Sequence, residues 1–150
     1  MTARRVLTST RVLKAVTRPA LSEDLRGVVG LLGALGSGAT EETVADFLRR
    51  GGEVQVASLL GELCGVGVLE WLHPLQEARP QAWLTALVTG AHARHRGVAR
   101  ALIDGLSQRV LQAGGDRLML GCQVERDDVR AFLAAAGFEA RHLVFERAVR

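Results

Sequence analysis

In residues 81–113, a segment with the pattern of an apolar strand is followed by a segment with the pattern of an amphipathic helix, and only a short basic loop separates the two. Residues 81–89 are mostly apolar, which indicates a strand buried in a sheet. From Gly97 onward, apolar residues recur at helical spacing and would form one face, at Val98, Leu102, Leu106 and Val110. A strand that runs straight into such a helix predicts a layered domain in which the helix covers one face of a sheet.

The rest of the chain continues this mixture of strand and helix patterns. Strands are predicted at residues 12–17, 54–60, 63–72, 117–122 and 137–149, and helices at residues 22–35, 41–50 and 126–136. Ser22 and Thr40 are the expected N-caps of the first two helices, and Gly61-Glu62 is the expected hairpin turn. The order β-α-α-β-β-β-α-β-α-β predicts an α/β domain of the α+β kind, with part of the sheet parallel in the second half.

Length and composition narrow the class of protein. With 150 residues, the chain is expected to form a single domain, residues 1–150, with a loosely ordered tail at residues 1–10. The formal net charge is only +3 and the arginines are scattered, so no nucleic-acid surface is predicted, and no apolar run is long enough for a membrane span. Cys64 and Cys122 lie in apolar stretches without ligand-spaced partners, which favours buried thiols, a cytoplasmic location and no metal site.

The loop before residue 98 has the composition of an anion-binding site. The first N–H groups of a helix lack partners within the helix, and the helix dipole favours negative charge at that end. Gly97 and Ala99 are small enough for a phosphate to approach the backbone, and Arg94 and Arg96 add positive charge beside it. This segment therefore predicts a phosphate site at a helix N-terminus.

The same six residues, Arg94-His95-Arg96-Gly97-Val98-Ala99, match the motif (Q/R)-x-x-G-x-(G/A) with which the GNAT acyltransferase superfamily binds the pyrophosphate of CoA. Three further segments are similar to that superfamily: Arg18-Pro19 before an acidic helix start, Gly61-Glu62-Leu63-Cys64-Gly65 in the hairpin, and Gly137-Phe138 after an alanine-rich helix. The chain thus resembles the superfamily over almost its whole length. The resemblance implies a mixed, mostly antiparallel central sheet, helices on both faces, and a splayed pair formed by strands 81–89 and 117–122.

The resemblance also implies how acetyl-CoA is bound. The pantetheine arm would lie between the splayed strands, against backbone groups near Val88 and Gly90. The N–H of Val88 would polarise the thioester carbonyl, and a fixed N–H aimed at a developing oxyanion lowers the barrier to acyl transfer. The pyrophosphate site would comprise Arg94, His95, Arg96, Gly97, Val98 and Ala99.

Two residues that serve catalysis in many members of the superfamily are missing. A tyrosine before the Gly-Phe pair often protonates the departing CoA thiolate, and an Asn often stands seven residues earlier. These positions hold Leu133 and Arg126, and the chain has no tyrosine at all. The strand at residues 81–89 also lacks the acid that often deprotonates the amine. Glu70 and His92, with His95 as a third, are the substitute candidates for the base, since histidine titrates near neutrality.

The sequence therefore predicts an enzyme that moves an acetyl group from acetyl-CoA to a primary amine on a small molecule or peptide. The expected mechanism is direct attack in a ternary complex. Because the tyrosine and the strand acid are missing, a non-catalytic acyl-CoA sensor or partner-binding module is the alternative. A nucleic-acid-binding domain is a further alternative, suggested by the arginine content alone. The resemblance adds a homodimer as an expected assembly, since members of the superfamily commonly dimerise.

Overall fold

In the computed structural model, which describes residues 13–150, five strands form one sheet in the order β1-β2-β3-β4-β5. The strands are β1 Val16–Pro19, β2 Glu53–Leu59, β3 Glu62–Leu72, β4 Gln81–Thr89 and β5 Leu118–Met119. Strands β1 to β4 pair antiparallel with one another, whereas β5 pairs parallel with β4. The predicted mixed, mostly antiparallel sheet is confirmed.

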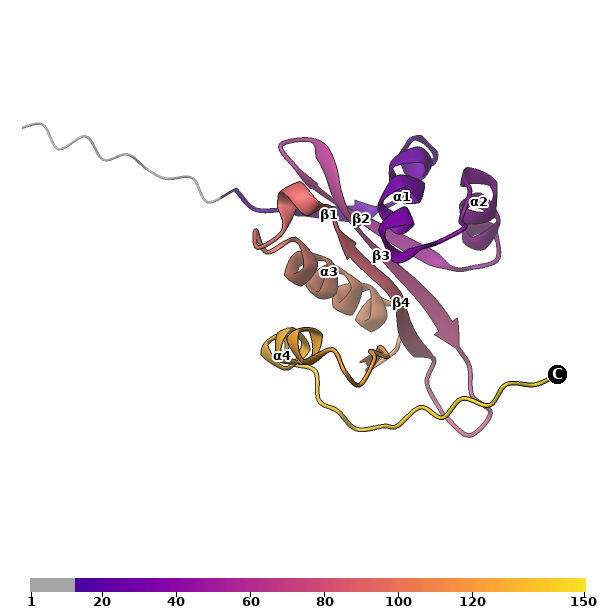
Figure 1. Ribbon diagram of the computed structural model, residues 1–150. Coiled ribbons are helices and arrows are strands. Elements are labelled where there is room, and N and C mark those ends of the chain that lie inside the picture. Colours follow the sequence, from indigo (N-terminus) through magenta and orange to yellow (C-terminus); the bar gives the residue numbers. More distant parts are fainter. Residues whose placement is uncertain (1–12) are drawn as a thin grey trace, which may run out of the picture.

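Helices cover both faces of this sheet, as predicted (Figure 1). Helices α1 Leu25–Leu32 and α2 Glu41–Arg49 lie on one face, and α3 Val98–Gln112 and α4 Asp127–Ala135 lie on the other. Short 3-10 turns η1 Ser22–Asp24 and η2 Gly33–Leu35 flank α1, and η3 Ala91–Ala93 lies between β4 and α3. None of the helices within residues 13–150 is long and apolar enough to cross a membrane.

The apolar stripe of α3 is buried against the middle of the sheet. Its four predicted core residues are each at most 2% exposed, namely Val98, Leu102, Leu106 and Val110. Glycines on β3 make this close approach possible, because a Cβ at Gly65 would lie 2.6 Å from Cγ1 of Val98 and one at Gly67 would lie 2.8 Å from Cδ1 of Leu106. The start of α3 is therefore fixed in position directly over β3 and β4.

The first helix starts differently from the prediction. Ser22 lies inside η1 and is not its N-cap, because the Leu21 N–H donates to the Asp24 carboxylate at 2.7 Å. Arg18 donates two hydrogen bonds to the same carboxylate, at 2.6 and 3.0 Å, and holds the pKa of Asp24 below its usual value. The second cap is confirmed, since the Thr40 hydroxyl accepts from the Thr43 N–H at 3.2 Å.

The strand ends also depart from the prediction. β5 has only two residues instead of the predicted 117–122, and the predicted strand at residues 137–149 does not form. Neither segment has a further strand beside it to complete a ladder. Cys122 is exposed because it lies past the end of β5, whereas Cys64 is buried, which raises the pKa of its thiol. Part of the predicted strand 12–17 and the tail at residues 1–10 lie outside the described residues.

Candidate functional site

A β-bulge in β4 marks the point where β4 and β5 separate. Leu84 and Ala86 face consecutive residues of β3, so Thr85 is an extra residue in the ladder. β5 pairs with β4 only as far as Trp83. Because a bulge bends its strand and increases the local twist, residues 84–89 leave β5 and have no partner strand on that side within the part of the chain described. This gap corresponds to the splayed pair that the sequence predicts.

The pairing register determines which backbone groups face the gap. The Gly90 N–H donates to the Cys64 carbonyl at 2.7 Å, so it points toward β3. In an antiparallel ladder the direction alternates, so the N–H of Val88, two residues earlier in the same register, also points toward β3. The backbone N–H groups of Leu87 and Thr89 point instead toward the open edge of β4. The expected donor Val88 is therefore turned away from the gap, and the Gly90 N–H is already bonded.

The backbone before α3 is shaped to receive an anion. His95 and Gly97 both have positive φ angles, 62° and 76°, on either side of Arg96. Left-handed residues in such a turn direct successive N–H groups to one side. The Ala101 N–H donates to the Gly97 carbonyl at 3.0 Å, so the preceding N–H groups, including those of Val98 and Ala99, have no acceptor within the helix. A Cβ on Gly97 would meet nothing within 4 Å, so this side of the turn is open.

Two arginines add unpaired positive charge to this helix start. Arg94 and Arg96 are exposed, and within residues 13–150 neither has a carboxylate within 4 Å. By contrast, Arg100 one turn later is within 3.5 Å of Asp104. The free guanidinium groups, the helix dipole and the unbonded N–H groups all favour a negatively charged ligand.

Helix α4 is tied to the same end of α3. The Arg100 guanidinium donates to the Ala135 carbonyl at 3.1 Å, and the Phe138 N–H donates to the Leu133 carbonyl at 2.9 Å. Leu133 is half-buried in this last turn of α4 and supplies no proton donor. Arg126 is the residue before α4 and donates to Asp128 at 3.1 Å, which raises the pKa of Arg126.

The two main candidate bases lie at opposite ends of β3. His92, in η3, lines a cavity of about 210 Å³ together with Cys64 and Arg96, next to the start of α3. Glu70 lies six residues farther along β3 than Cys64, which is about 20 Å at the usual strand rise. They therefore do not form one catalytic pair, and His95 is exposed in the turn before α3.

Glu70 lies on the sheet face that carries α1 and α2. Leu69 on one side of it is buried under α3 and Val68 packs against the α1 cluster, so alternation places Glu70 with Val68. Its partner across the ladder is Trp83, whose Nε1 is buried and has no hydrogen-bond partner among the described residues. An exposed carboxylate and an unsatisfied indole N–H thus lie beside the point where β4 and β5 begin to separate.

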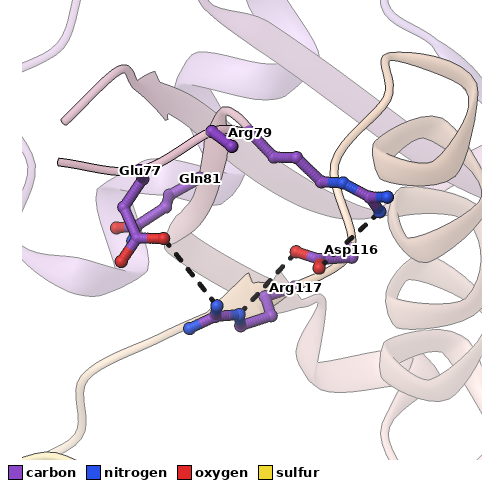
Figure 2. A pocket seen from close by; sticks show the side chains of 6 residues that line it. Glu77, Arg79, Gln81, Asp116 and Arg117 are labelled. Carbon is purple, nitrogen blue, oxygen red and sulfur yellow. Dashed lines mark ion pairs between the residues drawn. The ribbon is translucent and has the colours of Figure 1, made fainter. Parts of the chain in front are cut away.

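A charged cluster closes the other end of the β4–β5 pair. Figure 2 shows Glu77 and Arg79 from the loop before β4 facing Asp116 and Arg117 from the segment before β5. Arg117 lies 3.9 Å from Glu77 and 3.7 Å from Asp116, and Arg79 lies 3.7 Å from Asp116. Each of these exposed ion pairs contributes little to the free energy of folding. Two of them connect the loop before β4 with the segment before β5, so they hold the paired end of the two strands together. The bulge in β4 separates the strands at the opposite end.

Within residues 13–150, no three His, Cys, Asp or Glu side chains gather as a metal-binding group.

The sequence matches the model of the acetyltransferase (GNAT) family over residues 33–138. Comparison of the sequence with curated proteins gives no match. The matched region includes the sheet from β2 to β5, the bulge and the start of α3, which are the parts that build the site.

Solved structures share the fold across nearly the whole chain. An aminoglycoside acetyltransferase from an uncultured soil metagenomic sample, in complex with sisomicin, has a TM-score of 0.77 at 16% identity, covering 91% of this chain and 97% of that one. Ribosomal-protein-alanine N-acetyltransferase from Brucella melitensis biovar Abortus 2308 has a TM-score of 0.76 at 18% identity, covering 91% and 100%. Aminoglycoside N-acetyltransferase AAC(6')-Iy in complex with CoA has a TM-score of 0.77 at 20% identity, covering 91% and 95%.

Proposed function

Because the chain belongs to the GNAT family of acetyltransferases, we propose that it transfers an acetyl group from acetyl-CoA to a primary amine on a small molecule or peptide. The observation that carries this proposal is the open edge of β4 leading directly to the basic start of α3. A CoA thioester needs both features, a strand edge for its amide-bearing arm and an anion site for its pyrophosphate.

In the proposed complex, the pyrophosphate binds to the N–H groups of residues 97–99, with Arg94 and Arg96 beside it. The pantetheine arm then runs back along β4. Thr89 is the first residue whose N–H faces the gap, and Leu87 is the next, about 7 Å farther from α3 at the usual strand rise. We therefore assign the pantetheine amide to Thr89 and the thioester carbonyl to the N–H of Leu87, in place of Val88.

Acyl transfer would proceed by direct attack in a ternary complex. The amine nitrogen attacks the thioester carbon, the oxyanion is stabilised by the Leu87 N–H, and the C–S bond breaks to release CoA as a thiolate. The amine proton must reach a base. Leu87 faces Gly67, three residues from Glu70, which is about 10 Å along β3. We propose that Glu70 receives this proton through water, because His92 lies with Arg96 at the pyrophosphate end.

The proposed acceptor site is the sheet face beside Glu70 and Trp83. The carboxylate would attract a protonated amine, and the side chain of Trp83 would lie beside that amine, across the ladder from Glu70. The similar structures act on an aminoglycoside and on the alanine of a ribosomal protein, and both acceptors present amines. A small-molecule amine and the amine of a peptide are therefore both suitable first substrates to test.

A single experiment tests this function against its alternative. We expect saturating acetyl-CoA to raise the melting temperature, since a ligand present at a hundred times its Kd stabilises the native state by about 2.7 kcal/mol. Thiol release is then measured across a panel of aminoglycosides, amino acids and peptides. An unchanged melting curve contradicts the proposal. Stabilisation without thiol release on any amine supports the acyl-CoA sensor, which the apolar Leu133 favours.

Leu133→Tyr tests whether the missing proton donor limits the rate. A thiolate is stable enough near neutral pH to leave unprotonated. We therefore expect measurable wild-type turnover and a several-fold gain from the phenol, less than the hundredfold or more that general-acid catalysis typically contributes. Leu133→Phe is the matched control, with the same ring and no hydroxyl. The measurement is kcat at saturating acetyl-CoA. If both variants change kcat equally, the hydroxyl does not act as an acid.

A further inference from the structure

One part of the sheet lies beyond the cover of α1 and α2. These helices pack in one core cluster with side chains of the sheet, and the cluster reaches no farther toward the end of β3 than Val68 and no nearer to the start of β4 than Ala86. In Figure 1, α1 and α2 lie over the opposite end of these two strands. The acceptor site proposed beside Glu70 therefore belongs to a part of this face that no helix of the described chain covers.

Three strands contribute apolar side chains to this uncovered face. Leu72 lies two residues beyond Glu70 on β3, so it points to the same face, and it is 46% exposed. On β5, Leu118 packs in the cluster under α3, so its neighbour Met119, which pairs with Trp83, points to the uncovered face. Trp83 and Met119 are half-buried. Leu72, Trp83 and Met119 thus form an apolar patch beside Glu70.

The patch contains a single uncompensated charge. Glu70 makes no ion pair with any residue between 13 and 150, so its carboxylate is free to attract an ammonium group. At the start of β4 and β5, by contrast, Arg79 and Arg117 lie among Glu77 and Asp116, and these four charges cancel (Figure 2). That cluster offers no net attraction for a second cation.

Helix α2 also turns its basic end toward this side of the sheet. The helix ends at residues 49–50, both arginines, and β2 starts at Glu53, which pairs with Leu69, the neighbour of Glu70. The acids at residues 41–42 lie in the first turn of α2, about 12 Å away along the helix at its usual rise. A second ammonium group near the patch would therefore meet positive rather than negative charge.

We propose that the acceptor is a monoamine, with one ammonium group at Glu70 and an apolar alkyl or aryl body on Leu72, Trp83 and Met119. This inference rests on the proposed function, for which it names the class of acceptor. A second ammonium group on the same molecule would leave water for an apolar surface without a carboxylate to pair with, which is costly. Aminoglycosides carry several such groups and fit this patch poorly, although one of the similar structures is an aminoglycoside acetyltransferase.

A matched pair of amines tests this preference. n-Heptylamine and 1,6-diaminohexane have equally long chains and differ at the far end, where a methyl group is replaced by an ammonium group. With acetyl-CoA, we expect kcat/KM to be at least about tenfold higher for n-heptylamine, since one group in an apolar pocket changes kcat/KM by about 10- to 200-fold. Sisomicin should react more slowly still. Equal values for the pair, or a preference for the diamine or for sisomicin, overturn the proposal.

Binding without acetyl-CoA separates this proposal from the proposed function. In an NMR titration, the indole N–H signal of Trp83 should shift with n-heptylamine at a Kd at least about tenfold lower than with 1,6-diaminohexane. If none of the amines releases thiol, acetyl transfer is contradicted, but this titration still decides whether the patch binds monoamines. No shift with n-heptylamine, or equal Kd values for the two amines, overturns the proposal even where thiol release is observed.

Leu72→Glu should shift the preference toward the diamine. The new carboxylate would lie on the same face as Glu70, about 7 Å farther along β3, so kcat/KM for 1,6-diaminohexane relative to n-heptylamine should rise at least about tenfold. Leu75→Glu is the matched control, because Leu75 is fully exposed in the loop before β4, and it should leave the ratio unchanged. An equal rise in both variants, or no rise in either, shows that the patch does not select the acceptor and overturns the proposal.

Discussion

We expect the Gly97→Glu variant to bind acetyl-CoA at least about tenfold more weakly than wild type, a loss of about 1.4 kcal/mol. Gly97 stands immediately before α3 with φ at 76°, and the direction in which a side chain would point is open. A glutamate there would place a carboxylate where the unbonded N–H groups and the two free arginines attract the pyrophosphate. Isothermal titration calorimetry with acetyl-CoA measures the loss directly.

Gly97→Ala is the control for this variant. Any L-residue at this positive φ costs about 1–2 kcal/mol of stability, so alanine reproduces the backbone strain without the charge. The affinity difference between the two variants isolates the carboxylate. A glutamate variant that is folded and binds acetyl-CoA as tightly as the alanine variant would place the pyrophosphate elsewhere.

The order of the elements as far as α4, and the helix start proposed here as the anion site, could be predicted from the sequence because both depend on local signals. Helical spacing of Val98, Leu102, Leu106 and Val110 identifies the buried face of α3 without knowledge of what covers it. A small residue followed by a helix start is likewise a local pattern, and the structure gives Gly97 the left-handed conformation that glycine adopts most easily.

The assignment of Val88 shows what a local pattern leaves out. Which N–H groups of β4 face the gap depends on the register with β3, and a shift by one residue reverses every direction. The bulge at Thr85 adds a residue to that register, and no glycine or proline marks it in the sequence. That the N–H groups of Leu87 and Thr89 face the gap can therefore be recognised only once the pairing of β4 with β3 is known.

The N-cap at Ser22 was wrongly predicted for a related reason. Serine before two acids is a common helix start, but here Asp24 has a stronger partner in Arg18, six residues earlier, on β1. The bidentate pair draws the carboxylate back to the Leu21 N–H and shifts the start of the turn by one residue. A contact between two elements overrides the preference of a single residue.

We expect Gly65→Ala to destabilise the protein by about 1–3 kcal/mol, the usual cost of overpacking a core, and to weaken acetyl-CoA binding as well. Its Cβ would lie 2.6 Å from Cγ1 of Val98, 3.1 Å from Cδ1 of Leu102 and 3.3 Å from the Val88 carbonyl. Relief requires α3 to move off the sheet, and that movement displaces the anion site from the open edge of β4. Thermal unfolding and acetyl-CoA titration measure the two effects.

A double-mutant cycle with Val98→Ala identifies the contact responsible. Val98→Ala removes the methyl group that lies nearest to the new Cβ, so the double variant should recover part of both losses, with a coupling energy of about 0.5–3 kcal/mol. Gly30→Ala is the matched control within α1: a Cβ there meets nothing within 4 Å, and alanine should stabilise a helix interior by about 0.5–1 kcal/mol. Strictly additive effects of the two substitutions at Gly65 and Val98 would show that the β3–α3 contact does not set the position of the anion site.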